Sequence, residues 1–267
     1  MSHRGRCWGL LGVALLLNAC AMQPRSGEAQ LAAVRDSIQA AFPDIRREDV
    51  RPSAAPGLFE IRRGSQYAYI TADGRYLIRG DLVDLGSGEV LTERRRRDLR
   101  AETVRRLSDT AIEYAPPADQ LRQTVHIFAD VDCDYCRQLH QEIPALNAKG
   151  IAVRYLFYPR RGERSKGYVE AVRAYCATDR KKALDQMFAG QVLEDARSDC
   201  SHPVSEQLAA AQAIGVKGTP MTLLPDGSIL YGYMSADGLQ QAMGLGDPAP
   251  APATPAAAVP EPKAAPA

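Results

Sequence analysis

Cys133 and Cys136 are separated by only Asp134 and Tyr135 in this chain of 267 residues. They follow an apolar run typical of a buried strand and precede a segment with helical spacing. At the first turn of a helix, unpaired backbone amides and the helix dipole stabilise a thiolate. We therefore expect Cys133 to be the more acidic and more exposed thiol, and Cys136 to be buried and resolving. This pattern indicates a redox-active pair.

Two other uses of such a pair have to be weighed, a zinc site and a structural disulfide. A structural zinc ion takes four ligands, and no second C-x-x-C or C-x-x-H follows at zinc-ribbon spacing. His126 and His140 fall on a predicted core strand and a predicted helix face, where packing explains His140 better than proton transfer. A disulfide that closes so small a loop stabilises little. We therefore favour redox chemistry, with no metal and no cofactor.

The composition is that of a soluble globular protein, with 45% hydrophobic and 24% charged residues. The 33 basic and 32 acidic side chains leave a net charge of +1, which excludes a large electrostatic footprint for nucleic acid. Residues 247–267 hold seven Pro and nine Ala and are predicted to be disordered. The remaining chain suits two modest domains.

Residues 1–19 are predicted to be a secretory signal, with a basic start and an apolar run over 7–17 that is too short to cross a bilayer as a helix. Leu17–Cys20 resembles the lipobox of bacterial lipoproteins, in which the chain is cut before the cysteine and the lipid is attached to it. We therefore favour Cys20 as a lipidation site. The alternative is an A-x-A cleavage that releases a soluble protein beginning at Met22.

Export would make disulfides possible, because disulfides persist in oxidising compartments. Once the signal is removed and Cys20 is lipidated or lost, four cysteines remain. They form two plausible pairs, Cys133 with Cys136 and Cys176 with Cys200. The second pair is far apart and lacks a helix-start context, so we interpret it as a structural disulfide.

Residues 30–90, after a tether over 20–29, are predicted to form a small α+β domain. The expected elements are a helix and four short strands: Gln30–Ala41, Leu58–Arg62, Gln66–Thr71, Arg75–Arg79 and one strand within Asp81–Val90. So small a sheet has a thin core and exposed edges that favour pairing with a second copy. We therefore predict a homodimer.

Residues 91–117 are predicted to be a solvated linker helix, Leu91–Tyr114, closed by Pro116 and Pro117. This segment carries four consecutive arginines. Glu93 with Arg97, and Glu102 with Arg106, have the i,i+4 spacing of helical ion pairs. The arginines therefore have a structural explanation, and binding to nucleic acid or anionic lipid is not favoured.

Residues 118–246 have the strand and helix alternation of an α/β domain with a parallel strand pair. The predicted elements are Thr124–Phe128, Cys136–Ala148, Ile151–Phe157, helices Tyr168–Ala177, Lys181–Ala189 and Val204–Ile214, a hairpin of Met221–Leu224 with Ile229–Tyr233, and a last helix Ala236–Met243. The strand before Cys133 and the helix after it position the reactive pair.

A second motif, Gly215–Pro220, reads G-V-K-G-T-P and precedes a predicted strand. An X-Pro bond in a glycine-flanked turn is where a cis peptide is tolerated. A C-x-x-C at a helix start with a later G-V-x-G-T-P resembles the thioredoxin fold, in which this proline is cis and lies against the active disulfide. The cis state of Pro220 is implied by that resemblance alone.

Nearly the whole mature chain resembles the periplasmic DsbC/DsbG family of disulfide isomerases. The matching segments are Tyr69–Gly74 with Gly80, Ile127–His140, Val153–Arg160, the Cys176 and Cys200 pair, and G-V-K-G-T-P ahead of Pro225–Gly227. The resemblance implies a dimerisation domain, a linker helix and a thioredoxin-like domain with a helical insertion, in a V-shaped dimer whose cleft holds misfolded substrate. Asp134 departs from the glycine common in the isomerase, and a carboxylate there disfavours the thiolate unless it turns into solvent.

We therefore expect the Cys133 thiolate to attack non-native disulfides in exported proteins, with Cys136 resolving the mixed disulfide. Thr219 and Pro220 would hold the substrate chain beside the sulfur, with Tyr135 and Asp134 in the same substrate-binding surface. The resemblance implies a membrane reductant of the DsbD type and a periplasmic location, and Ala21 after Cys20 resembles the sorting signal for the outer membrane. The alternatives are an oxidase, a partner-specific reductase, or mainly a holdase chaperone.

Overall fold

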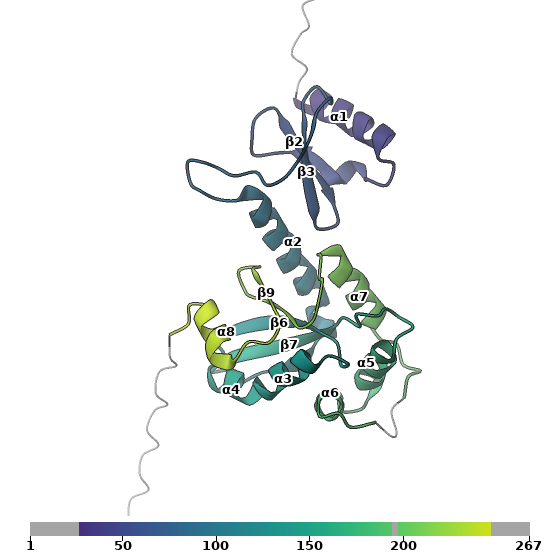
Figure 1. The fold of residues 1–267 in the computed structure, drawn as a ribbon, viewed down its shortest axis with the longest axis vertical. Helices are drawn as coiled ribbons and strands as arrows, with labels where there is room; N and C mark the ends of the chain where they lie inside the picture. The colour runs from purple at the N-terminus through teal and green to yellow at the C-terminus, as the bar shows by residue number, and fades with distance from the viewer. Residues whose placement is uncertain (1–26, 194–196, 247–267) are drawn as a thin grey trace, which may run out of the picture. The chain divides into compact units, whose positions relative to one another are not determined.

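The computed structural model describes residues 27–193 and 197–246 (Figure 1). The predicted signal, Cys20 and the Pro/Ala-rich segment lie outside the described residues. The chain divides into two compact units, one up to Ile61 with Tyr69–Ile78, the other Arg62–Ala68 with Arg79 onward. Within the described ranges, no helix is both long and apolar enough to cross a bilayer.

The first unit packs one helix on a small sheet. Helix α1 (Gly27–Ala41) buries Val34 and Ile38 in a core with sheet residues Phe59 and Ile70. The sheet has the order β1-β2-β3-β4, with β1 (Val50–Pro52), β2 (Leu58–Arg63), β3 (Gln66–Thr71) and β4 (Leu77–Arg79). All three residues of the edge strand β4 are exposed.

The predicted strand within Asp81–Val90 is wrong. Val83 and Val90 form a single antiparallel bridge, because the chain between them reverses at once. The amide of Gly88 donates to the Asp84 carbonyl at 2.7 Å, and the amide of Asp84 donates to the Glu89 carbonyl at 2.9 Å. So tight a turn leaves no length for a strand ladder.

The linker helix α2 (Leu91–Leu107) ends seven residues before the predicted end at Tyr114. A 3-10 turn (Ser108–Thr110) follows, and Ile112–Tyr114 forms strand β5, antiparallel to β7 (Ile151–Phe157). The helix stops here because Ile112 is buried in the hydrophobic core of the second unit once its segment joins the sheet edge. Tertiary pairing therefore overrides the helical pattern of this segment.

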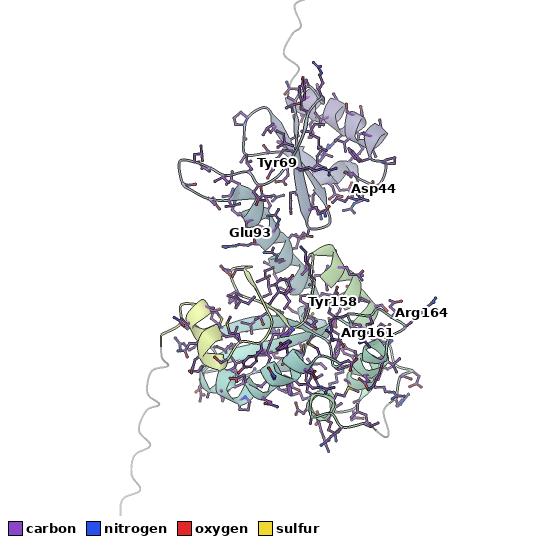
Figure 2. The ribbon with its side chains drawn as sticks, in the orientation of Figure 1. Asp44, Tyr69, Glu93, Tyr158, Arg161 and Arg164 are labelled. Atoms are coloured by element: carbon purple, nitrogen blue, oxygen red, sulfur yellow. A yellow bond between two sulfur atoms is a disulfide. The ribbon has the colours of Figure 1, made fainter. Side chains whose placement is uncertain are left out.

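Helix α2 is not a fully solvated linker, because its last turns pack on the sheet of the second unit. Val104 and Leu107 are buried with Phe128 and Leu156. Its ion pairs also differ from the predicted i,i+4 pairs, because Arg97 and Arg106 contact carboxylates of other elements of the second unit and Glu93 pairs with other arginines of α2. Three of these ion pairs are Arg97 with Asp226 at 3.5 Å, Arg106 with Glu206 at 2.7 Å, and the buried Arg100 with Glu93 at 2.7 Å; Glu93 is labelled in Figure 2.

The second unit is built on a five-stranded sheet of order β5-β7-β6-β8-β9, with β6 (Gln123–Ala129), β8 (Met221–Leu223) and β9 (Ile229–Tyr231). Strands β6 and β7 are parallel, as predicted, and the other pairs are antiparallel. Successive residues of β6 and β7 point to opposite faces of the sheet, so they contribute to two different hydrophobic clusters. Ile127 and Tyr155 face one hydrophobic cluster, and Phe128 and Leu156 face the other.

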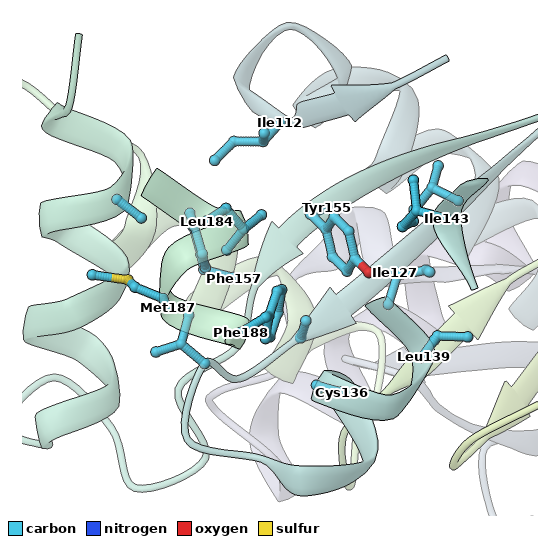
Figure 3. Packing of buried hydrophobic residues seen from close by; sticks show 14 of the residues in the cluster. Ile112, Ile127, Cys136, Leu139, Ile143, Tyr155, Phe157, Leu184, Met187 and Phe188 are labelled. Carbon is cyan, nitrogen blue, oxygen red and sulfur yellow. The ribbon is translucent and has the colours of Figure 1, made fainter. Parts of the chain in front are cut away.

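Helices cover both faces of this sheet (Figure 1). They are α3 (Asp134–Gln141), α4 (Ile143–Ala148), α5 (Lys166–Cys176), α6 (Arg180–Phe188), α7 (Val204–Ala213) and α8 (Ala236–Ala242). Figure 3 shows Cys136 and Leu139 of α3 within the larger cluster, beside Phe188 of α6. The predicted single helix Cys136–Ala148 is two helices, because Pro144 has no amide to continue the ladder of α3.

Cys176 and Cys200 form a disulfide, with Cα atoms 5.6 Å apart and a separation of 24 positions in the sequence. Replacing both by Ala is expected to lower the free energy of unfolding by about 3 kcal/mol, because the unfolded chain loses a loop constraint. Urea unfolding of the oxidised protein and the double variant measures this difference. An unchanged midpoint and slope would contradict a structural role for this disulfide.

Candidate redox site

Cys133 is positioned by the end of β6 and the start of α3. It is the N-cap residue of α3, and its amide donates to the Asp130 carbonyl at 3.1 Å. Cys136 lies one turn into the helix, and both cysteines are free thiols. Cys133 is 3% exposed and Cys136 is 1% exposed, so Cys133 is the more exposed of the two, as predicted, but both side chains are buried. The sequence could not show this burial, because residues far along the chain help to cover the sulfur.

The loop ahead of β8 contacts Cys133. The Thr219–Pro220 peptide is cis. The Cys133 thiol donates to the Thr219 carbonyl, with an Sγ–O distance of 3.3 Å, across 86 positions of sequence. Pro220 is itself buried, and its carbonyl accepts from the Gly232 amide at 2.9 Å. The fold thus brings the C-x-x-C and G-V-K-G-T-P motifs together.

The two thiols have opposite proton affinities. The pKa of Cys133 is lowered to about 5, chiefly because the Cys136 thiol donates a hydrogen bond to its sulfur. The Thr219 side chain, the Cys136 amide and the Arg160 guanidinium add to this effect, and burial opposes it. Burial, together with the interaction with Cys133, raises the pKa of Cys136 well above its ordinary value. Near neutral pH, Cys133 is therefore a thiolate and Cys136 a thiol.

Tyr135 and Asp134 lie on the solvent side of this pair. Tyr135 is exposed, and the Asp134 side chain is 90% exposed, with its Oδ1 3.7 Å from Nη1 of Arg137. Water and Arg137 therefore screen the carboxylate from Cys133. Because the Asp134 carboxylate turns into solvent, it does not disfavour the Cys133 thiolate.

His140 lies one turn beyond Cys136 on α3 and faces the aromatic core. Its Nδ1 is 3.3 Å from the Tyr155 hydroxyl, its Nε2 is 2.9 Å from Oδ1 of Asp185, and its ring packs on Phe188 at 4.6 Å. Burial lowers the pKa of His140. These contacts place His140 in a packed, hydrogen-bonded core position. Among residues 27–193 and 197–246, no group of three His, Cys, Asp or Glu side chains is arranged for a metal ion.

Two residues near the pair were missed by sequence reasoning, Asp130 and Arg160. The buried Asp130 carboxylate accepts from Nε of Arg160 at 3.1 Å. The sequence does contain a signal for this pair: Asp130 is a carboxylate at the end of an apolar strand, three residues before Cys133. A charge that is buried there needs a partner of opposite charge.

Thiol–disulfide exchange on a thioredoxin-like fold is the chemistry that this arrangement serves. Residues 109–246 match the family model of a thioredoxin-like domain, and residues 25–93 match the disulfide bond isomerase protein N-terminal domain. The chain belongs to the DsbC/DsbG family of thiol:disulfide isomerases.

The thiol:disulfide interchange protein DsbC of Escherichia coli K12 is 32% identical over 190 residues, which cover 71% of this chain and 78% of that protein. DsbC of Salmonella typhimurium is 30% identical, covering 76% of this chain and 82% of that protein. The crystal structure of a disulfide interchange protein from Neisseria gonorrhoeae is 26% identical, with a TM-score of 0.46, over 51% of this chain and 94% of that one.

Membership of this family makes the protein a disulfide oxidoreductase that isomerises disulfides. It also implies a periplasmic location, and it supports a homodimer that acts on exported proteins with disulfides.

Proposed function

We propose that Cys133 is the attacking thiol of this isomerase and Cys136 its resolving thiol. The observation that carries the proposal is the contrast between a Cys133 whose pKa is lowered to about 5 and a Cys136 whose pKa is raised by burial. Only a thiolate attacks a disulfide, so the pair has one nucleophile ready at neutral pH.

The Cys133 thiolate attacks one sulfur of a non-native substrate disulfide, which forms a mixed disulfide and releases a substrate thiolate. If a second substrate thiolate then attacks, a new substrate disulfide forms and Cys133 leaves as a thiolate, with no net electron transfer. If Cys136 loses its proton and attacks Cys133 instead, a Cys133–Cys136 disulfide forms. The substrate is then released with both sulfurs reduced, and the enzyme is oxidised by two electrons. That second outcome needs a membrane reductant of the DsbD type to restore the thiols.

Thr219 and Pro220 are the proposed substrate-binding residues next to the sulfur, with Tyr135 and Asp134 beside them at the surface. The Thr219 carbonyl oxygen lies 3.3 Å from the Cys133 sulfur, so a substrate strand along this loop would bring its disulfide to the thiolate. Residues 118–246 would be the catalytic domain, 91–117 the linker and 30–90 the dimerisation domain. The exposed edge strand β4, with Leu77 and Ile78, is available for pairing with a second copy.

The Cys136→Ala variant tests these roles in the cell, because it cannot resolve mixed disulfides. It is expected to accumulate covalent adducts with envelope proteins that disappear on reduction, whereas Cys133→Ala should form none. The wild-type pair should be found mostly reduced by acid quenching and thiol labelling. A mostly oxidised pair would favour an oxidase, and adducts through Cys136 alone would overturn the assignment.

A lipid anchor at Cys20, with the outer membrane as its destination, is also part of the proposal. It is supported by the lipobox-like Leu17–Cys20 and by Ala21 after the cysteine. Labelled palmitate is expected to enter the wild-type protein and not Cys20→Ala, and membrane fractionation should place the label with the outer membrane. A protein without label that begins at Met22 would contradict the anchor and support A-x-A cleavage.

A further inference from the structure

Asp130 is a buried carboxylate at the end of β6, with a side chain only 5% exposed. A buried charge is costly unless hydrogen bonds and an opposite charge compensate it. Its Oδ1 accepts from the Asp132 amide at 3.0 Å, and its Oδ2 accepts from both the amide and Nε of Arg160, at 3.0 and 3.1 Å. The carboxylate therefore ties the loop before Cys133 to the segment after β7.

Gly167 of α5 shows how closely Asp130 is enclosed. A Cβ added to this glycine would lie 2.6 Å from Oδ1 of Asp130, far inside contact distance. Helix α5 thus covers the carboxylate from a third direction. The position of Asp130 is fixed by packing as well as by hydrogen bonds.

Arg160 connects Asp130 to the backbone next to the reactive cysteine. With Nε held by Asp130, its Nη2 donates to the Asp132 carbonyl at 3.0 Å. That carbonyl belongs to the peptide bond that joins Asp132 to Cys133. The guanidinium is therefore bound to the backbone unit from which the reactive side chain begins, and its charge acts on the Cys133 sulfur and the Cys133 charge acts on it.

The other charged groups around Cys133 are turned outward or already paired. Oδ2 of Asp132 lies 3.8 Å from Nη1 of Arg161, which is labelled in Figure 2. The Arg161 side chain is 80% exposed, and Asp134 faces solvent beside Arg137. Cys136 is neutral at ordinary pH, and Thr219 contributes its carbonyl to the contact with Cys133. The positive charge of Arg160 helps to lower the pKa of Cys133, and 42% of the Arg160 side chain is exposed.

We propose that Arg160, anchored by Asp130, is a positioning residue of the exchange reaction, which fixes the Asp132–Cys133 peptide and holds a positive charge beside the attacking sulfur. This inference rests on the proposed role of Cys133 as nucleophile. When the thiolate attacks, its negative charge spreads toward the substrate sulfur, so a fixed cation favours Cys133 as the leaving thiolate in the return step. It would therefore support repeated turnover by isomerisation.

The test compares Arg160→Gln, Arg160→Lys and the matched control Arg161→Gln, which removes an exposed charge one residue away. Thiolate absorbance at about 240 nm, followed as a function of pH, gives the titration midpoint of Cys133 in each reduced protein. Arg160→Gln is expected to raise the midpoint by about one pH unit, which is about a tenfold loss of thiolate below the midpoint. Arg160→Lys keeps the positive charge, so its titration midpoint should rise by less than about half a pH unit, and Arg161→Gln should leave the midpoint unchanged.

Equal shifts in Arg160→Gln and Arg160→Lys would overturn the proposal, because the effect would then come from packing and not from charge. An equal shift in Arg161→Gln would overturn it as well. If Arg160→Gln does not fold, Arg160→Met replaces it, and about 0.5 M salt should raise the wild-type midpoint by screening. Mass mapping of the alkylated cysteine separates the two proposals, since labelling of Cys136 in wild type would reject the role of Cys133 itself.

Discussion

The reduced protein is expected to react with iodoacetamide at Cys133 at a nearly constant rate between pH 6 and 8. Its pKa of about 5 means that the thiolate is already formed above that pH and is lost only when the pH falls through about 5. An ordinary thiol, with a pKa near 8.5, would react about a hundredfold faster at pH 8 than at pH 6. Alkylation rates followed by mass spectrometry across pH 4 to 9 measure this profile.

The matched variants at position 136 test the cause of the lowered pKa. The Cys136 thiol is the largest contributor to that shift, as a hydrogen-bond donor. Cys136→Ser keeps a donor and should retain most of the low midpoint, whereas Cys136→Ala should move it toward the value of an ordinary thiol. A wild-type rate that climbs tenfold per pH unit from 6 to 8 would contradict the thiolate assignment.

Cys136→Ser is also expected to separate the two reactions of the enzyme. Net reduction of insulin requires attack by Cys136 on the mixed disulfide, so this variant should lose about a hundredfold or more of its reductase rate. Isomerisation of a scrambled substrate can be completed by a substrate thiol, so it should fall by no more than about threefold. Both rates are measured with the same preparation under one glutathione buffer.

A parallel control with Cys133→Ser should lose both activities, because no nucleophile then reaches the substrate. If Cys136→Ser lost isomerisation as strongly as reduction, the enzyme would be a reductase that reaches new pairings by repeated reduction and reoxidation. That outcome would mean that every productive cycle requires attack by Cys136 on the mixed disulfide.

Much of this fold could be predicted from local patterns. Strand β7 (Ile151–Phe157) and strand β3 (Gln66–Thr71) match their predicted bounds, because both carry strong β-rich runs between turn signals. Helix α2 was predicted too long, since the strand pairing of Ile112–Tyr114 with β7 is a tertiary effect that helical periodicity does not contain.

The site was predicted in its chemistry but not in its surroundings. The C-x-x-C motif and its helix start are local features. The burial of Cys133 depends on the loop at Thr219, 86 positions away, and the charge near it depends on Arg160, whose partner Asp130 lies 30 positions earlier. Contacts of this kind exist only once the sheet has brought its strands together.

Reactivation of ribonuclease with scrambled disulfides tests the central claim most directly. The prereduced mature protein and its Cys133→Ser variant are compared at equal concentration in the same redox buffer, with ribonuclease activity followed over time. We predict that the wild type restores activity and that the variant stays at the uncatalysed rate. Equal rescue by the variant, or no rescue by the wild type, would contradict an isomerase whose nucleophile is Cys133.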